Sequence, residues 1–253
     1  MRQPTSQPPP ARHAPPSCLC LAPEYRMTQN IYDDPNFFRA YGQLPRSIQG
    51  LEAAPEFPAL RALLPDLNGR DVLDLGCGYG WFCRWARSQG AGRVTGIDVS
   101  ELMLARARSM TDDAAIIYAR ADLEAITLKP KAYGLVYSSL ALHYLINLEA
   151  LLGEVRAALT PSGRLVFSVE HPILTAPLQP GWSEGASGAK SWPVNNYLRE
   201  GERCTDWLTK GVIKQHRTIA SYVGLLLRQG FRLAHLELGA HAGTDRERAQ
   251  ACR

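Results

Sequence analysis

Short apolar runs alternate with amphipathic stretches along most of the chain. Six runs rich in apolar residues predict strands, at residues 72–75, 94–97, 115–119, 133–137, 165–169 and 231–238. Between them, apolar residues spaced three and four apart predict helices, at residues 81–89, 101–108, 148–159 and 219–229. Strands that alternate with helices form parallel βαβ units, so the pattern predicts an α/β fold with a mostly parallel sheet between two helical layers.

A glycine-rich turn follows the first predicted strand, which contains Asp74. Gly76, Gly78 and Gly80 occupy alternate positions, and a helix is predicted directly behind them. Glycine is favoured where the backbone turns with positive φ or lies close to a ligand. The free N–H groups at the start of the helix can then bind a polar or anionic ligand.

A second acid, Asp98, ends the next predicted strand. A carboxylate in this place can accept hydrogen bonds from both hydroxyls of a ribose. The two strands together therefore predict a nucleoside-containing cofactor on a Rossmann-like three-layer sandwich. Dinucleotide-binding proteins use the spacing G-x-G-x-x-G and hold a pyrophosphate. Here the spacing is G-x-G-x-G, and Asp74 would repel a pyrophosphate.

The segment Val72–Gly78 resembles the first motif of the class I S-adenosylmethionine (SAM) methyltransferases. The resemblance implies SAM as the cofactor, with Asp74 near the ammonium of its methionine moiety. It also implies that Asp122 lies near the adenine amino group and that the backbone of Leu123 reads the ring. The predicted cofactor-binding residues are Asp74, Gly76, Cys77, Gly78, Asp98, Val99, Met103, Asp122, Leu123 and Ser138.

Further segments widen the resemblance, at residues 41–47, 138–144, 168–173 and 216–218. Together they are similar to one bacterial branch of the family, in the methyltransferase type 11/12 and ubiquinone-biosynthesis-like group. The resemblance implies transfer of a methyl group to a small-molecule acceptor, at oxygen, nitrogen or carbon. The family's sheet normally closes with a seventh, antiparallel strand. Residues 242–253 are too polar to form it, so we expect the sheet to lack this strand.

An acceptor that carries a hydroxyl needs a base, and imidazole titrates near neutral pH. The candidate catalytic residues are His171, His216 and His143, each at or near the end of a predicted element. Each of these histidines could instead stabilise the structure by hydrogen bonding. The candidate substrate-binding residues are Tyr41, Arg46, Tyr144 and Trp182.

Composition excludes several other classes of protein. The net charge of +4 is mild, and no basic run indicates nucleic acid. No apolar stretch approaches the ~20 residues of a membrane span. The six cysteines show no paired C-x-x-C spacing, so the sequence predicts no metal site and a reduced, cytoplasmic setting. We expect a monomer or a homodimer.

The chain divides into three regions by composition. Residues 1–26 are rich in proline and predict a disordered extension. Residues 27–241 predict the SAM-binding domain, in which the long polar stretch 175–210 is interpreted as a lid or cap. Residues 242–253 form a polar tail.

Two other functions fit parts of the sequence. An NAD-linked Rossmann oxidoreductase is disfavoured by the glycine spacing and by Asp74. A non-catalytic SAM-binding protein is suggested by the altered C-terminus. Binding of SAM but not NADH would exclude the first, and methyl transfer to any acceptor would exclude the second.

Overall fold

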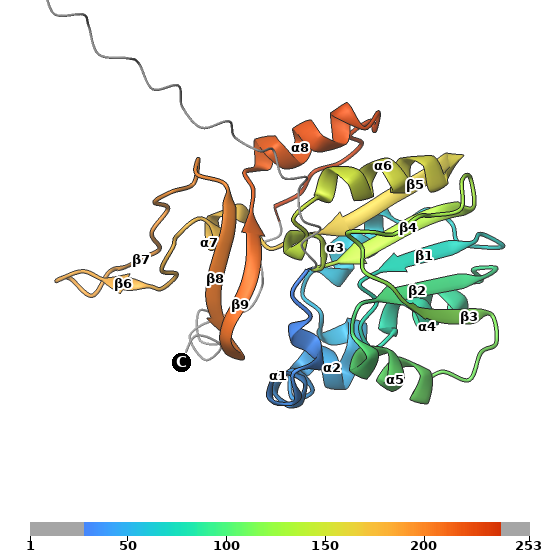
Figure 1. The fold of residues 1–253 in the computed structure, drawn as a ribbon, viewed down its shortest axis with the longest axis horizontal. Coiled ribbons are helices and arrows are strands. Elements are labelled where there is room, and N and C mark those ends of the chain that lie inside the picture. The colour runs from blue at the N-terminus through green and yellow to red at the C-terminus, as the bar shows by residue number, and fades with distance from the viewer. Residues whose placement is uncertain (1–27, 239–253) are drawn as a thin grey trace, which may run out of the picture.

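The fold is seen in a computed structural model that describes residues 28–238. Its centre is a parallel sheet with the strand order β3-β2-β1-β4-β5 (Figure 1). The strands are β1 (Val72–Leu75), β2 (Val94–Asp98), β3 (Ile116–Arg120), β4 (Tyr133–Ser139) and β5 (Leu159–Ser168). The chain runs outward from β1 to β3 and then returns to β4. Ligands bind at such a reversal, beside the carboxyl ends of the strands. The predicted α/β class and Rossmann-like layering are confirmed.

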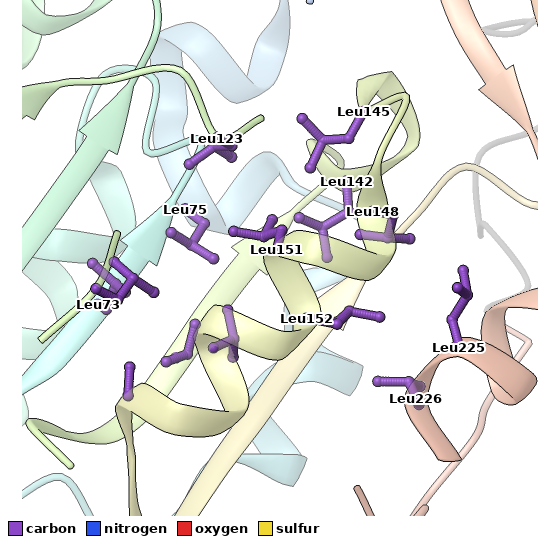
Figure 2. Close-up of a cluster of buried hydrophobic side chains, with 14 of the residues drawn as sticks. Leu73, Leu75, Leu123, Leu142, Leu145, Leu148, Leu151, Leu152, Leu225 and Leu226 are labelled. Carbon is purple, nitrogen blue, oxygen red and sulfur yellow. The ribbon is translucent and has the colours of Figure 1, made fainter. Parts of the chain in front are cut away.

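Helices cover both faces of the sheet because the strand side chains alternate between two apolar clusters. Val72 joins the cluster that includes residues of α3 (Phe57–Leu63), α4 (Trp81–Ser88) and α5 (Glu101–Ser109). Leu73 and Leu75 join the other, with leucines of α6 (Leu148–Ala158). Leu225 and Leu226 of α8 (Ile219–Arg228) belong to this second cluster (Figure 2).

Two further groups of elements lie on the side to which the strands point (Figure 1). The first group precedes the sheet and contains η1 (Ile31–Asp33), α1 (Pro35–Tyr41), α2 (Pro45–Gln49) and η2 (Gly50–Ala53). Asp34 begins α1 by accepting hydrogen bonds from two backbone N–H groups of the first turn. A short helix, η3 (Leu142–Tyr144), follows β4 on the same side.

The second group falls in and beyond the predicted lid. It contains α7 (Pro172–Thr175), β6 (Ser183–Glu184), β7 (Lys190–Ser191), β8 (Gly201–Trp207) and β9 (Thr209–His216). The pairs β6–β7 and β8–β9 form two antiparallel two-stranded sheets. The polar stretch therefore carries regular structure, and its larger hairpin continues to His216 rather than ending at residue 210.

The prediction of a sixth strand at residues 231–238 was wrong. This segment follows α8 without strand structure, and Leu233, Leu236 and Leu238 are 42%, 57% and 60% exposed. Within residues 28–238, β5 has no neighbour on its outer edge. An apolar alternation forms a strand only where a partner supplies backbone hydrogen bonds, and this segment has none. Residues 1–26 and the polar tail 242–253 lie outside the described residues.

Candidate functional site

A cavity of about 1460 Å³ lies at the carboxyl ends of the strands. Loops that follow β1, β2, β3 and β4 form one part of its wall, and η1 to α3 and the β8–β9 hairpin form others. Fifteen predicted site residues line it: Tyr41, Arg46, Asp74, Gly76, Cys77, Gly78, Asp98, Val99, Met103, Asp122, Leu123, His143, Tyr144, His171 and Trp182. Ser138 and His216 do not.

The glycine turn brings backbone to the cavity wall. Gly76, Gly78 and Gly80 all have positive φ, at 75°, 53° and 68°. A Cβ on Gly76 would lie 2.4 Å from the Cβ of Ala141, so this glycine is required by close approach as well as by conformation. The N–H of Gly76 donates to the carbonyl of Ile97 (2.8 Å), which ties the turn to β2.

Asp98 links the turn to the helix that follows β2. Its Oδ2 accepts a hydrogen bond from the Gly78 N–H (2.9 Å), and its Oδ1 accepts one from the Ser100 N–H (2.9 Å). Burial raises the pKa of this carboxyl, while the two backbone donors act in the opposite direction. Each carboxylate oxygen keeps a second lone pair, so the group can still accept from a diol.

Asp74 is a buried acid without a cation. It is 2% exposed and lines the cavity, and its carboxylate accepts a hydrogen bond from the Cys83 thiol (3.3 Å). Burial raises its pKa to about 7, and the nearby Asp98 carboxylate adds to this shift. Within residues 28–238 it forms no ion pair. Such a group favours a ligand that carries an ammonium.

The third strand supplies the next part of the same wall. Asp122 and Leu123 follow β3, and the side chain of Asp122 accepts from the N–H of Glu124 (3.0 Å). Met103 of α5 is buried and lines the cavity beside Val99. The predicted cofactor residues are thus brought together from β1, β2 and β3, apart from Ser138.

Ser138 points away from the cavity. Its hydroxyl is fully buried and donates to the carbonyl of Leu75 (2.7 Å), which fixes β4 against β1. The next residue, Ser139, lines the cavity and donates to Glu56 (2.9 Å), which also binds Arg46 as an ion pair. Neighbouring residues of a strand face opposite sides of the sheet. Both serines lie in a strand covered on both faces, so polarity did not distinguish them.

His216 is a structural residue. It is fully buried, and both ring nitrogens have partners: Nε2 lies 2.8 Å from the carbonyl oxygen of Tyr197 and Nδ1 lies 2.7 Å from the hydroxyl of Thr175. A carbonyl can only accept, so Nε2 carries a proton, while Nδ1 is engaged by the Thr175 hydroxyl, which also lies 3.3 Å from the Pro172 carbonyl oxygen. His216 therefore joins β9 to α7 and to the loop before β8. Neither ring nitrogen is left to bind the molecule that receives the methyl group.

The other two candidate bases line the cavity with one nitrogen engaged. Nδ1 of His143 accepts from the N–H of Glu170 (3.4 Å), and Nδ1 of His171 accepts from the N–H of Ile173 (3.1 Å). In the neutral rings the proton is therefore on Nε2. Burial lowers the pKa of His143 to about 4 and also lowers the pKa of His171, so both rings are neutral near pH 7.

Further cavity residues, which the sequence did not predict, belong to the same wall. Tyr32 of η1 donates from its hydroxyl to that of Tyr144 (3.2 Å). Lys214 of β9 forms an ion pair with Glu170 (2.7 Å) and lies 5.3 Å from the ring centre of Trp207. A lysine is rarely buried unless it is paired. Lys214 is two residues after the buried Val212, so both side chains lie on the same face of β9. This spacing was the signal in the sequence that Lys214 is buried.

Residues 28–33, the N-terminal segment, connect two parts of the cavity wall, the β8–β9 hairpin and the start of α5. The side-chain amide of Gln29 donates to the Gly211 carbonyl (2.9 Å) and accepts from the Ile213 N–H (2.9 Å), as a neighbouring strand would. Asp33 accepts from the Ser100 hydroxyl (2.6 Å) and the Leu102 N–H (3.1 Å) at the start of α5. The segment therefore connects the hairpin to the helix behind Asp98.

The described part of the chain has neither a cluster of metal ligands nor a helix that could span a membrane. No group of three or more histidine, cysteine, aspartate or glutamate side chains there is arranged to hold a metal ion. None of the helices between residues 28 and 238 is long and apolar enough to cross a membrane.

Comparison with known proteins gives consistent results. The methyltransferase domain family matches residues 73–167, from β1 into β5. The chain is 50% identical to an S-adenosylmethionine-dependent methyltransferase from Mesorhizobium loti of known structure, with a TM-score of 0.73. That match covers 79% of this chain and 91% of the other.

Two curated proteins extend the comparison. The chain is 31% identical to an uncharacterized protein of Haemophilus influenzae, over 82% of this chain and 85% of the other. It is 38% identical to a malonyl-[acyl-carrier protein] O-methyltransferase of Enterobacter lignolyticus, over 49% of this chain and 48% of that protein. The chain thus spans about half the length of this second relative.

Proposed function

The chain belongs to the class I SAM-dependent methyltransferases, and we propose that it transfers the methyl group of SAM to a small molecule bound in the same cavity. SAM supplies a methyl group on a sulfonium, which is open to attack by a nucleophile. The protein's task is to hold both molecules in line, because alignment provides most of the rate in such transfers.

The observation that carries the proposal is the buried acid at one end of a continuous cavity. Asp74 has no cation of its own and suits the ammonium of SAM, while Asp98 suits the ribose hydroxyls. Asp122 and Leu123 are proposed to receive the adenine. The turn at Gly76 lets the backbone approach the ligand. From these residues the cavity continues to Tyr144 and the hairpin.

The proposal is tested first by calorimetric titration with S-adenosylhomocysteine (SAH). We expect binding that is lost in Asp98→Ala and retained in Asp113→Ala, whose carboxylate is exposed and pairs with Arg87 away from the cavity. The second step is transfer of label from [methyl-³H]SAM to a panel of alcohols, amines and acids. SAH binding without transfer to any acceptor would leave a non-catalytic SAM-binding protein.

A further inference from the structure

Three side chains at the acceptor part of the cavity, His143, His171 and Tyr144, present hydrogen-bond donors. The two histidines that line it, His143 and His171, expose Nε2–H because their Nδ1 atoms accept from backbone N–H groups. Tyr144 accepts the hydroxyl proton of Tyr32, so its own proton is available to a ligand. A nucleophile that must lose a proton finds no free proton acceptor among these three side chains.

The carboxylate of Glu170, which also lines the cavity, is already engaged in an ion pair. Glu170 holds the ammonium of Lys214 at 2.7 Å, and Lys214 is only 7% exposed. If Glu170 took a proton from an acceptor, it would leave a buried ammonium without its partner, which is costly. An ammonium with three donors can meanwhile give one to Glu170 and another to a ligand.

Two cations and one anion act on the His143 ring. Lys214 and Arg217 both act to lower the pKa of His143, and Glu170 opposes them. Arg217 donates to the carbonyls of Leu145 (2.6 Å) and Ile146 (2.8 Å) and forms no ion pair within residues 28–238. One Nη of its guanidinium is buried without a partner. Of the two cations, Lys214 lines the cavity, and its ammonium can bind a negatively charged group of a ligand beside it.

We propose that the acceptor is a carboxylate, that Lys214, Tyr144 and His143 bind one of its oxygens, and that the product is a methyl ester. The proposal rests on the proposed methyltransferase function and names its substrate class. The other carboxylate oxygen supplies the electron pair of the new O–CH₃ bond. The C–S bond breaks with its electrons remaining on sulfur, which yields SAH, and no proton changes hands. The ester has lost the charge that the donors bind, which favours its release.

The chemistry of the product tests the proposal directly. The protein is incubated with [methyl-³H]SAM and matched aliphatic and aromatic acids, alcohols and amines, and also with a protein-free metabolite extract of bacterial cells. Alkali releases volatile methanol from methyl esters but not from ethers, methylamines or C-methyl products. We expect the transferred label to be alkali-labile. Stable label would overturn the carboxylate proposal while leaving the methyltransferase function intact, and no transfer at all would overturn both.

Two substitutions test the assigned roles. Lys214→Met should raise KM for the acid about tenfold or more, the effect of losing one charge-assisted hydrogen bond. SAH affinity should be unchanged, and Lys210→Met at the exposed tip of the same hairpin should match the wild type. Glu170→Gln should maintain or lower KM, because it removes the competing anion. A loss of kcat of about 100-fold in Glu170→Gln would instead identify Glu170 as a general base and overturn the proposal.

A pH profile and a binding experiment distinguish binding from a purely structural role. At saturating SAM, kcat/KM for the acid should be flat between about pH 6 and pH 9, because carboxylates are ionised throughout and no base titrates. Titration of the acid into the SAH-bound protein should show binding that Tyr144→Phe weakens. A rise of kcat/KM with pH, or equal binding of the matched alcohol, would contradict the proposal.

Discussion

At the cofactor end of the cavity, the central side chains come from one stretch, residues 74–103, in which β1, the glycine turn, β2 and α5 follow one another. At the acceptor end, Tyr32, Tyr144 and Lys214 come from η1, η3 and β9, which are far apart in the sequence. The first region can be recognised as a motif because its geometry is local. The second exists only once the chain has folded, so it can vary without altering the cofactor site.

The largest effect is expected from Asp98→Ala, which removes a buried carboxylate at the cofactor end. Loss of charge-assisted hydrogen bonds to the ribose should lower SAH affinity about 100-fold or more, measured by calorimetry. Asp98→Asn removes the negative charge but keeps the size of the side chain, and its amide oxygen can still accept from the Gly78 N–H. If the Asp98→Ala variant binds SAH normally, the cofactor end has been assigned to the wrong residues.

The next largest effect is expected from a substitution in the β8–β9 hairpin. His216→Ala should lower the free energy of unfolding by about 3 kcal/mol, because a buried carbonyl and a buried hydroxyl lose their partners. Chemical denaturation measures this loss, and proteolysis should shift toward residues 176–200. SAH affinity should change little. His235→Ala, at an exposed histidine, is the matched control. A large loss of SAH affinity in His216→Ala would show that the two ends are not independent.

A pair of glycine substitutions tests close approach within the cofactor end. Gly76 and Gly69 have similar φ values, 75° and 69°, but only Gly76 has an atom in the space of a Cβ. Both alanine variants should lose about 1 kcal/mol from backbone strain. Gly76→Ala should lose a further 1–3 kcal/mol from overpacking and should also lose SAH binding. Equal thermal stability of the two variants would show that the turn yields to the added methyl.

The smallest effect is a pH dependence that originates at Asp74. Its pKa is about 7 in the free protein, so below pH 7 the carboxyl is increasingly protonated and cannot pair with an ammonium. SAH affinity should therefore rise with pH toward about pH 8, by up to about tenfold per unit well below the pKa. Calorimetry in buffers of different ionisation enthalpy should detect proton release. Asp74→Asn should weaken binding and flatten the profile.

The same contrast explains which features the sequence could predict. The alternation of strands and helices predicted the five strands that form the sheet and a sixth that is absent from it, and the DLGCG motif with Asp98 predicted residues that line the cavity. The face of Ser138 could not be predicted, because a strand buried on both sides has no polar side to reveal its register. The segment 231–238 resembles a strand, but it does not pair with the free edge of β5, and an apolar pattern alone does not show whether such pairing forms.

The acceptor end was harder to predict for a different reason. Lys214 and Glu170 become a pair only when β9 is placed beside the loop after β5. The ordinary titration range of histidine predicts bases, but it takes no account of hydrogen-bond direction. Their roles depend on which nitrogen faces a backbone N–H, and that follows from local backbone geometry.

The N-terminal segment has a kinetic consequence. Gln29 binds the hairpin and Asp33 binds the start of α5, so the same few residues hold both parts of the cavity wall. Any opening of the cavity that displaces this segment breaks the contacts to the hairpin and to the helix behind Asp98 together. Turnover should therefore follow a compulsory order, in which SAM is the first molecule to arrive and SAH is the last to depart.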